Sequence, residues 1–329
     1  MKPRNHAIDM LKGLAILMIV YVHMHFAGAR FHRLPCEYLL IIALPAFCFA
    51  GGYVSLGKTD IPFGRFAAKK ARALLLPYIV FFAISFVLVQ IVNGFIRPDI
   101  NWLWGFLFAG GELLRLGNVP FGTVMSVLWF FPTMFFAYLV FWAAAKCKGR
   151  SFVITAIVLL FISLLFRHIF ADIKWTTPYN IKVIPLFAFY MCCGAVFKAY
   201  CTGKIPGERK TLLSLALLAL GTGIYIILRG CGQMQDMSTP LFIPVSLLLI
   251  VSLYGLFSVV ERFRILEYCG RKSLYIYGIH IIFLKFFALT GINITDNYLR
   301  QAVVFIVDIA LCCICFEAYE RIKFKLVGK

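Results

Sequence analysis

Long apolar stretches, each close to 20 residues, alternate with short polar segments along the 329-residue chain. A helix needs roughly 20 consecutive apolar residues to cross a bilayer. The pattern therefore predicts an all-α polytopic membrane protein with about ten transmembrane helices. No internal repeat or long linker divides the chain, so we expect one membrane domain over residues 1–329. The ten expected spans are 8–27, 37–56, 74–95, 125–145, 152–170, 183–199, 211–228, 241–260, 274–291 and 299–318.

The composition excludes the common soluble classes. Hydrophobic residues make up 62% of the chain and charged residues 14%, against about 45–50% and about 25% in soluble domains. A soluble enzyme, a disordered chain and a secreted disulfide scaffold are all incompatible with these values.

The positive charge is placed as expected for loops on the cytoplasmic side. A net charge of +19 could indicate nucleic-acid binding, but cytoplasmic loops of membrane proteins are also rich in Lys and Arg. With a cytoplasmic N-terminus, 23 of the 33 Lys and Arg residues fall in cytoplasmic segments, nine fall outside, and Lys285 lies within a span. We therefore expect both termini in the cytoplasm, membrane lipids as partners, and no nucleic-acid partner.

The first span carries polar residues on one helix face. Asp9, Lys12 and His23 are separated by steps of three or four residues through positions 16 and 20. Asp9 and Lys12 lie at the cytoplasmic end of this span. With a rise of 1.5 Å per residue, His23 lies about 22 Å deeper along the helix. Two interpretations are open for His23: a hydrogen-bonded packing residue, or a general base, since imidazole titrates near neutral pH.

Two later spans also contain ionisable residues, which are costly inside a membrane and usually have a partner or a function. Lys285 and Asp308 come out at equal depth on adjacent helices, which predicts a structural ion pair. His280 comes out about 9 Å from the cytoplasmic edge of the span that begins at 274. It either lines the path of a cofactor or bonds a neighbouring helix.

A basic segment precedes the third span. Arg65, Lys69, Lys70 and Arg72 belong to it, and three of them have helix-like spacing. The positive-inside rule alone explains such a segment. Cations gathered at the inner mouth of a helix bundle would also form a phosphate site, because Arg grips phosphate bidentately and Lys adds a point charge.

Five short motifs then occur in an order typical of one family. They are Ile8-Asp9-Met10-Leu11-Lys12-Gly13 continuing to His23, Pro45 to Tyr53 with its aromatic and Gly residues, Lys70-Ala71-Arg72 before Pro77-Tyr78, Leu128-Trp129-Phe130-Phe131, and Ser273-Leu274-Tyr275-Ile276-Tyr277-Gly278-Ile279-His280. Together they resemble the acyltransferase 3 family of bacterial membrane acyltransferases, including glycan O-acetyltransferases of the fucose-acetylase type. Three departures are visible: Lys70 stands where the family often has Arg, no His precedes Leu128-Trp129, and Gly51 stands where Ser is frequent.

The resemblance implies a function and a set of site residues. Such proteins take an acyl group, here expected to be acetyl, from cytoplasmic acyl-CoA and deliver it to a hydroxyl of a cell-surface or lipid-linked glycan. His23 would be the general base or carry a transient acyl group, and Asp9 would orient the first helix through Lys12 or a basic loop residue. The CoA phosphates would meet the basic segment and His280, no metal is expected, and the location implied is the bacterial cytoplasmic membrane.

Two other functions compete with this interpretation. A secondary transporter or exporter of a lipid-linked sugar would use the same intramembrane charges as a substrate path. A non-catalytic scaffold of a glycan assembly complex would tolerate the loss of His23 and Arg72.

Overall fold

The computed structural model is helical, with no strand among the residues that it describes. These are 5–29, 33–93, 106–107, 127–170, 178–202, 207–232, 239–260, 262–291, 294–295 and 297–327. The elements are α1 (His6–His23), η1 (Met24–Ala27), α2 (Arg33–Ser55), α3 (Phe63–Asn93), α5 (Phe130–Ala144), α6 (Arg150–Ile169), η3 (Pro178–Val183), α7 (Ile184–Tyr200), α8 (Gly207–Gly230), α9 (Phe242–Phe257), α10 (Arg264–Leu289) and α11 (Tyr298–Val327).

Within the described part, nine helices are long and apolar enough to cross a membrane. The expected all-α polytopic fold is therefore confirmed. The remaining expected span, 241–260, corresponds to α9, a shorter apolar helix of 16 residues. Large apolar side chains remain exposed on α3, α6, α8 and α11, as lipid-facing helices require.

The chain forms two compact units. The first comprises Met1–Ala46 with Pro206–Lys329, and the second comprises Phe47–Ile205. The division falls within α2, one residue after Pro45. The expectation of a single membrane domain stays a prediction.

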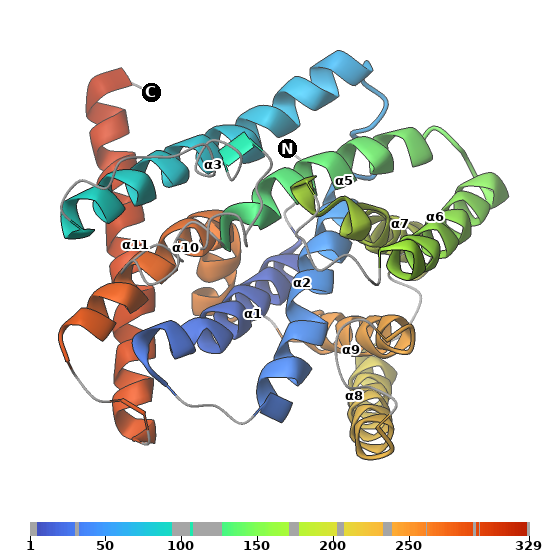
Figure 1. The fold of residues 1–329 in the computed structure, drawn as a ribbon. Helices are drawn as coiled ribbons and strands as arrows, with labels where there is room; N and C mark the ends of the chain where they lie inside the picture. The colour runs from blue at the N-terminus through green and yellow to red at the C-terminus, as the bar shows by residue number, and fades with distance from the viewer. Residues whose placement is uncertain are drawn as a thin grey trace. The chain divides into compact units, whose positions relative to one another are not determined.

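The first unit is organised around α1 and α10, which lie side by side in Figure 1. Two glycines allow this close contact: a Cβ at Gly13 would collide with the backbone carbonyl of Leu266, and one at Gly270 with that of Asp9. Small residues let membrane helices approach backbone to backbone, where van der Waals packing replaces the hydrophobic effect. α11 packs on α10, α9 packs on α1, and α8 packs on α9.

Polar contacts of Glu267 connect the beginnings of these two central helices. The Glu267 carboxylate on α10 is buried, and its Oε1 lies 3.1 Å from His6 Nδ1 at the start of α1. The same oxygen lies 3.6 Å from Arg262 Nε, just before α10. The ends of α1 and α10 are thus held by both packing and charge.

The second unit packs α5 against α3 and α7, and α6 against α7. The C-terminal part of α2 lies against α7 through two more glycines, because a Cβ at Gly52 would meet the Met191 carbonyl and one at Gly194 the Phe49 carbonyl. Two hydrogen bonds from the end of α5 reach the α2–α3 turn: Lys146 Nζ donates to Thr59 O at 2.9 Å, and Trp142 Nε1 donates to Ile61 O at 3.2 Å.

Candidate functional site

The histidines of α1 and α10 form a pair in the first unit. His23 Nδ1 lies 2.9 Å from His280 Nε2, and the ring centroids are 5.1 Å apart with 20° between the ring planes. His280 is fully buried, whereas His23 is half-buried. The pair lies about 24–26 Å along each helix from its first residue at 1.5 Å per residue.

The hydrogen bonds assign the proton positions of this pair. His280 Nδ1 lies 3.0 Å from Ile276 O and 2.9 Å from Tyr277 O. Both carbonyls only accept, so His280 Nδ1 carries the proton and the Nε2 of the neutral ring is an acceptor. His23 Nδ1 must then donate to it, so in the neutral His23 ring Nε2 is the unprotonated nitrogen.

His23 Nε2 has no hydrogen-bond partner among the described residues. The lone pair of His23 Nε2 is therefore available, while the other ring nitrogen, Nδ1, is held by its hydrogen bond to His280. Taking up a proton there would not break the His23–His280 hydrogen bond, because Nδ1 remains a donor in the imidazolium. The arrangement suits a proton acceptor.

The depth expected for His280 was wrong. The expected span began at residue 274, but α10 begins at Arg264, ten residues earlier. The additional residues include Glu267, Arg271 and Lys272, whose charges lower the hydropathy of this stretch. The longer helix moves His280 away from the cytoplasmic end and places it beside His23. Because both ring nitrogens are engaged, the geometry favours helix bonding over cofactor binding for His280.

Asp9 lies far from the histidine pair along the same helix, 14 residues or about 21 Å before His23. Its side chain is buried, and Lys12 Nζ donates to its Oδ1 at 3.4 Å. Its carbonyl is the group that Gly270 approaches. Asp9 thus lies where α1 and α10 cross.

The expected Lys285–Asp308 ion pair was also wrong. Lys285 Nζ lies over the Phe26 ring, 5.0 Å from its centroid. Asp308 is fully buried, and neither carboxylate oxygen has a hydrogen-bond partner within the described part of the chain. Counting residues fixes the depth of a side chain but not the rotation of its helix, which decides whether two side chains meet.

The basic segment lies on the first turns of α3, in the second unit, and its members differ in orientation. Arg65, Lys69 and Arg72 are exposed. Lys70 is half-buried, with Nζ donating to Ser55 Oγ at 3.2 Å. The three exposed cations have no ion pair within the described residues, so they are available to an anionic ligand.

Lys70 is held by an aromatic cage. Its Nζ lies 3.3 Å from the Tyr138 ring centroid on α5 and 5.4 Å from that of Phe66. Gly51 makes room for this cage, because a Cβ there would crowd the Tyr138 hydroxyl at 2.5 Å. Two of the family departures noted in the sequence, Lys70 and Gly51, are therefore neighbours of the same tyrosine.

The described residues contain no group of three or more His, Cys, Asp or Glu side chains that could hold a metal ion. The sequence motifs did not single out Ser55 or Tyr138, which contact Lys70 from other helices. Nor did they predict that His280 contacts His23, since the two residues are 257 positions apart.

The comparison with protein families covers nearly the whole chain. The profile described as an acyltransferase domain, that of the acyltransferase 3 family, matches residues 5–317. The chain belongs to the acyltransferase 3 family. It is thus a multi-pass membrane acyltransferase. No curated protein and no solved structure matched it.

Both sites described above fall within the acyltransferase 3 match, the histidine pair in the first unit and the Lys70 cage in the second. Acyl transfer to a hydroxyl needs a base for the hydroxyl proton and a binding site for the acyl donor. The first unit holds the His23–His280 pair, and the second holds exposed cations without an ion pair among the described residues.

Proposed function

We propose that this acyltransferase 3 protein moves an acyl group, acetyl in the first instance, from cytoplasmic acyl-CoA to a glycan hydroxyl. The acceptor is a cell-surface or lipid-linked glycan, and the protein acts in the bacterial cytoplasmic membrane. The family supports acyl transfer, and the free Nε2 of His23 is the observation that carries the proposal.

In the proposed reaction, His23 Nε2 removes the proton from the acceptor hydroxyl. The hydroxyl oxygen forms an ester bond to the acyl carbon, the carbon–sulfur bond of the thioester breaks, and CoA leaves as the thiol with the proton. General-base catalysis of this kind contributes typically about 10²–10⁴ in rate. A transient acyl group on His23 Nε2 uses the same lone pair.

His280 has a positioning role in this proposal. It fixes the tautomer and orientation of His23, and its own Nδ1 is held by two carbonyls of α10. A general base needs such an orienting partner, as in other catalytic arrangements built on histidine. Asp9 orients α1 through Lys12, and it does not touch the reacting atoms.

The donor phosphates are assigned to the basic segment of α3. Arg65, Lys69 and Arg72 are exposed without an ion pair in the described part, and Lys70 points inward to the tyrosine cage. Guanidinium and ammonium groups bind phosphate by charge-assisted hydrogen bonds.

The experiment that tests the proposal uses purified protein in nanodiscs with acetyl-CoA labelled in the acetyl group. We expect release of free CoA thiol and transfer of label to an added glycan or lipid-linked glycan acceptor. His23→Ala should lower transfer by at least about 10² while the protein still inserts.

The matched control is His168→Ala, since His168 is an exposed histidine of α6 in the second unit. Its transfer rate should equal that of the wild type. Full activity of His23→Ala would contradict the base assignment. An intact thioester with all acceptors would contradict acyl transfer from CoA and favour the transporter alternative.

A further inference from the structure

A cavity of about 290 Å³ lies in the second unit, where three apolar helices end. Of the candidate membrane spans, those of α2 and α7 stop at Ser55 and Tyr200, and that of α6 begins at Arg150. The cavity is lined from these three ends and from the α2–α3 and α5–α6 turns, so it lies at the boundary between membrane and water. Its volume is near the lower end of ligand pockets, about 300–1,000 Å³, which suits a lipid headgroup better than a whole lipid.

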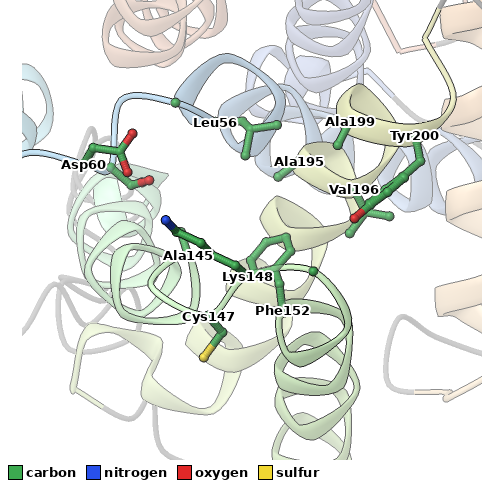
Figure 2. A pocket seen from close by; sticks show the side chains of 13 residues that line it. Leu56, Asp60, Ala145, Cys147, Lys148, Phe152, Ala195, Val196, Ala199 and Tyr200 are labelled. Atoms are coloured by element: carbon green, nitrogen blue, oxygen red, sulfur yellow. The ribbon is translucent and has the colours of Figure 1, made fainter.

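The inner wall of the cavity is apolar. Ala195 and Phe152 are buried there, whereas the Tyr200 ring is half exposed (49%). Figure 2 shows Tyr200 on the side of the pocket opposite Asp60. A tyrosine with one end in apolar surroundings and the other in water is typical of the membrane–water interface.

Two charged side chains of opposite sign line the same space. Asp60 belongs to the α2–α3 turn and Lys148 to the α5–α6 turn, and both are exposed. Figure 2 shows the Lys148 ammonium group extended toward the side where Asp60 lies, but no ion pair joins the two within the described residues. A ligand that carries one cation and one anion would complement both side chains, whereas a purely anionic ligand would be repelled by Asp60.

Both turns are held in place by hydrogen bonds. Lys146 Nζ donates to the carbonyl of Thr59, a buried residue of the lining, at 2.9 Å. Trp142 Nε1 donates to Ile61 O at 3.2 Å, just beyond the same turn. The two charged side chains therefore extend from fixed backbone positions, and a preformed pocket loses less entropy when it binds a ligand.

An exposed apolar face of α6 begins beside the cavity. The first turn of α6 contributes Phe152 to the lining, and the same helix exposes Ile154, Ile157 and Phe161 at a spacing that places them on one face. Lipid tails cover such a face in a membrane. A headgroup in the cavity would therefore have its tails along α6, which favours a lipid over a soluble ligand of the same charge.

We propose that the cavity binds the headgroup of an aminophospholipid, from the leaflet that the charge distribution predicts to be cytoplasmic. The primary ammonium of the lipid donates to the Asp60 carboxylate, and the phosphate accepts from the Lys148 ammonium. The carbons between them lie against Tyr200. A choline headgroup has no N–H to donate, so the cavity distinguishes ethanolamine from choline.

The experiment counts lipids bound to the purified full-length protein by native mass spectrometry in detergent. Phosphatidylethanolamine, phosphatidylcholine and phosphatidylglycerol with identical tails are titrated in turn. We expect one phosphatidylethanolamine to bind at least about tenfold more tightly than either of the other lipids, because only its headgroup complements both charges. Equal affinity for the three lipids, tighter binding of phosphatidylglycerol, or no bound lipid would each overturn the proposal.

Two substitutions of nearly unchanged shape test the charged lining. Asp60→Asn should abolish the preference for phosphatidylethanolamine over phosphatidylcholine. Lys148→Gln should weaken the binding of every phospholipid about three- to tenfold. The matched controls are Glu317→Gln on α11 and Lys210→Gln on α8, both in the first unit, which should bind lipids as the wild type does. Unchanged lipid binding in both Asp60→Asn and Lys148→Gln would refute the assignment.

A third substitution fills the cavity without altering a charge. Ala199→Phe should remove the lipid preference and also the rise in melting temperature that phosphatidylethanolamine gives the wild type, since a ligand stabilises the state that binds it. Ala216→Phe, at an exposed alanine of α8, should keep both. If Ala199→Phe fails to fold, as judged by size-exclusion chromatography, Asp60→Asn and Lys148→Gln decide the question.

Free O-phosphoethanolamine separates the lipid from a soluble zwitterion of the same chemistry. Because tails on α6 add apolar burial, the free headgroup should displace bound phosphatidylethanolamine only at concentrations at least about 100-fold higher than those of the competing lipid. Displacement at equal concentrations would identify a soluble ligand and overturn the lipid assignment. None of these measurements involves acyl transfer, so this proposal and the proposed function fail separately.

Discussion

At the residue scale, the His23 and His280 rings have different hydrogen-bonding states and therefore different proposed roles. His280 has both nitrogens occupied, by the carbonyls of its own helix and by His23. His23 has one nitrogen occupied and one free among the described residues. A half-exposed nitrogen can bond water, so the second lone pair of His23 carries no penalty of burial and can accept a proton from an incoming hydroxyl in the proposed reaction.

Substitution of His280 separates positioning from packing. His280→Leu removes the acceptor for His23 Nδ1–H and should lower kcat about 10–100-fold, with the KM for acyl-CoA nearly unchanged. His280→Gln keeps an acceptor oxygen at about the same distance from the backbone and should recover part of the loss. Steady-state kinetics of both variants check this, and an equal loss in both would point to packing alone.

At the scale of elements, sequence and structure agree on where helices exist and differ on where they begin. Apolar stretches of about 20 residues identified the spans, because bilayer thickness fixes their length. The start of α10 escaped this criterion, since Glu267, Arg271 and Lys272 make its first turns polar although Glu267 is buried. Hydropathy cannot anticipate a charge that is paired inside the protein.

The candidate site was predictable only in part, because hydropathy and spacing describe one helix at a time. Spacing along one helix placed Asp9, Lys12 and His23 on a common face, and the Asp9–Lys12 contact is present. Contacts between distant helices, such as His23 with His280, depend on helix rotation and crossing. Neither quantity is encoded in the period of a single span.

The crossing of α1 and α10 is the element on which the histidine pair depends. Gly13→Ala would bring a Cβ against the Leu266 carbonyl, so the helices must separate. Overpacking of this kind costs typically about 1–3 kcal/mol, and a backbone neighbour yields less easily than a side chain. We expect a lower melting temperature in detergent and reduced acyl transfer, measured by differential scanning fluorimetry and the thioester assay.

The control for this substitution is Gly223→Ala in α8, where a Cβ would meet no atom within 4 Å. It should leave melting temperature and activity unchanged or raise stability slightly, because Ala favours helix over Gly. If Gly13→Ala behaved in the same way, the close crossing of α1 and α10 would be refuted.

At the scale of the whole molecule, the charge distribution and the proposed chemistry require the same orientation. The positive-inside rule predicts that the α2–α3 and α5–α6 turns lie in the cytoplasm, and the basic segment proposed to bind the donor phosphates follows the α2–α3 turn. Acyl-CoA is cytoplasmic, whereas surface glycans are outside. The proposed function therefore fails if the topology is reversed, whatever the local geometry of each unit.

Two native cysteines test this orientation directly. Cys201 follows α7 and Cys231 follows α8, both are exposed free thiols, and the topology puts Cys201 in the cytoplasm and Cys231 outside. In right-side-out membrane vesicles, a membrane-impermeant maleimide should label Cys231 at once and Cys201 only after permeabilisation. Cys201→Ser and Cys231→Ser identify the two signals among the remaining cysteines. Labelling of Cys201 in intact vesicles would reverse the expected topology and place the basic segment of α3 outside the cell, where acyl-CoA is absent, and the transfer from CoA would have to be abandoned.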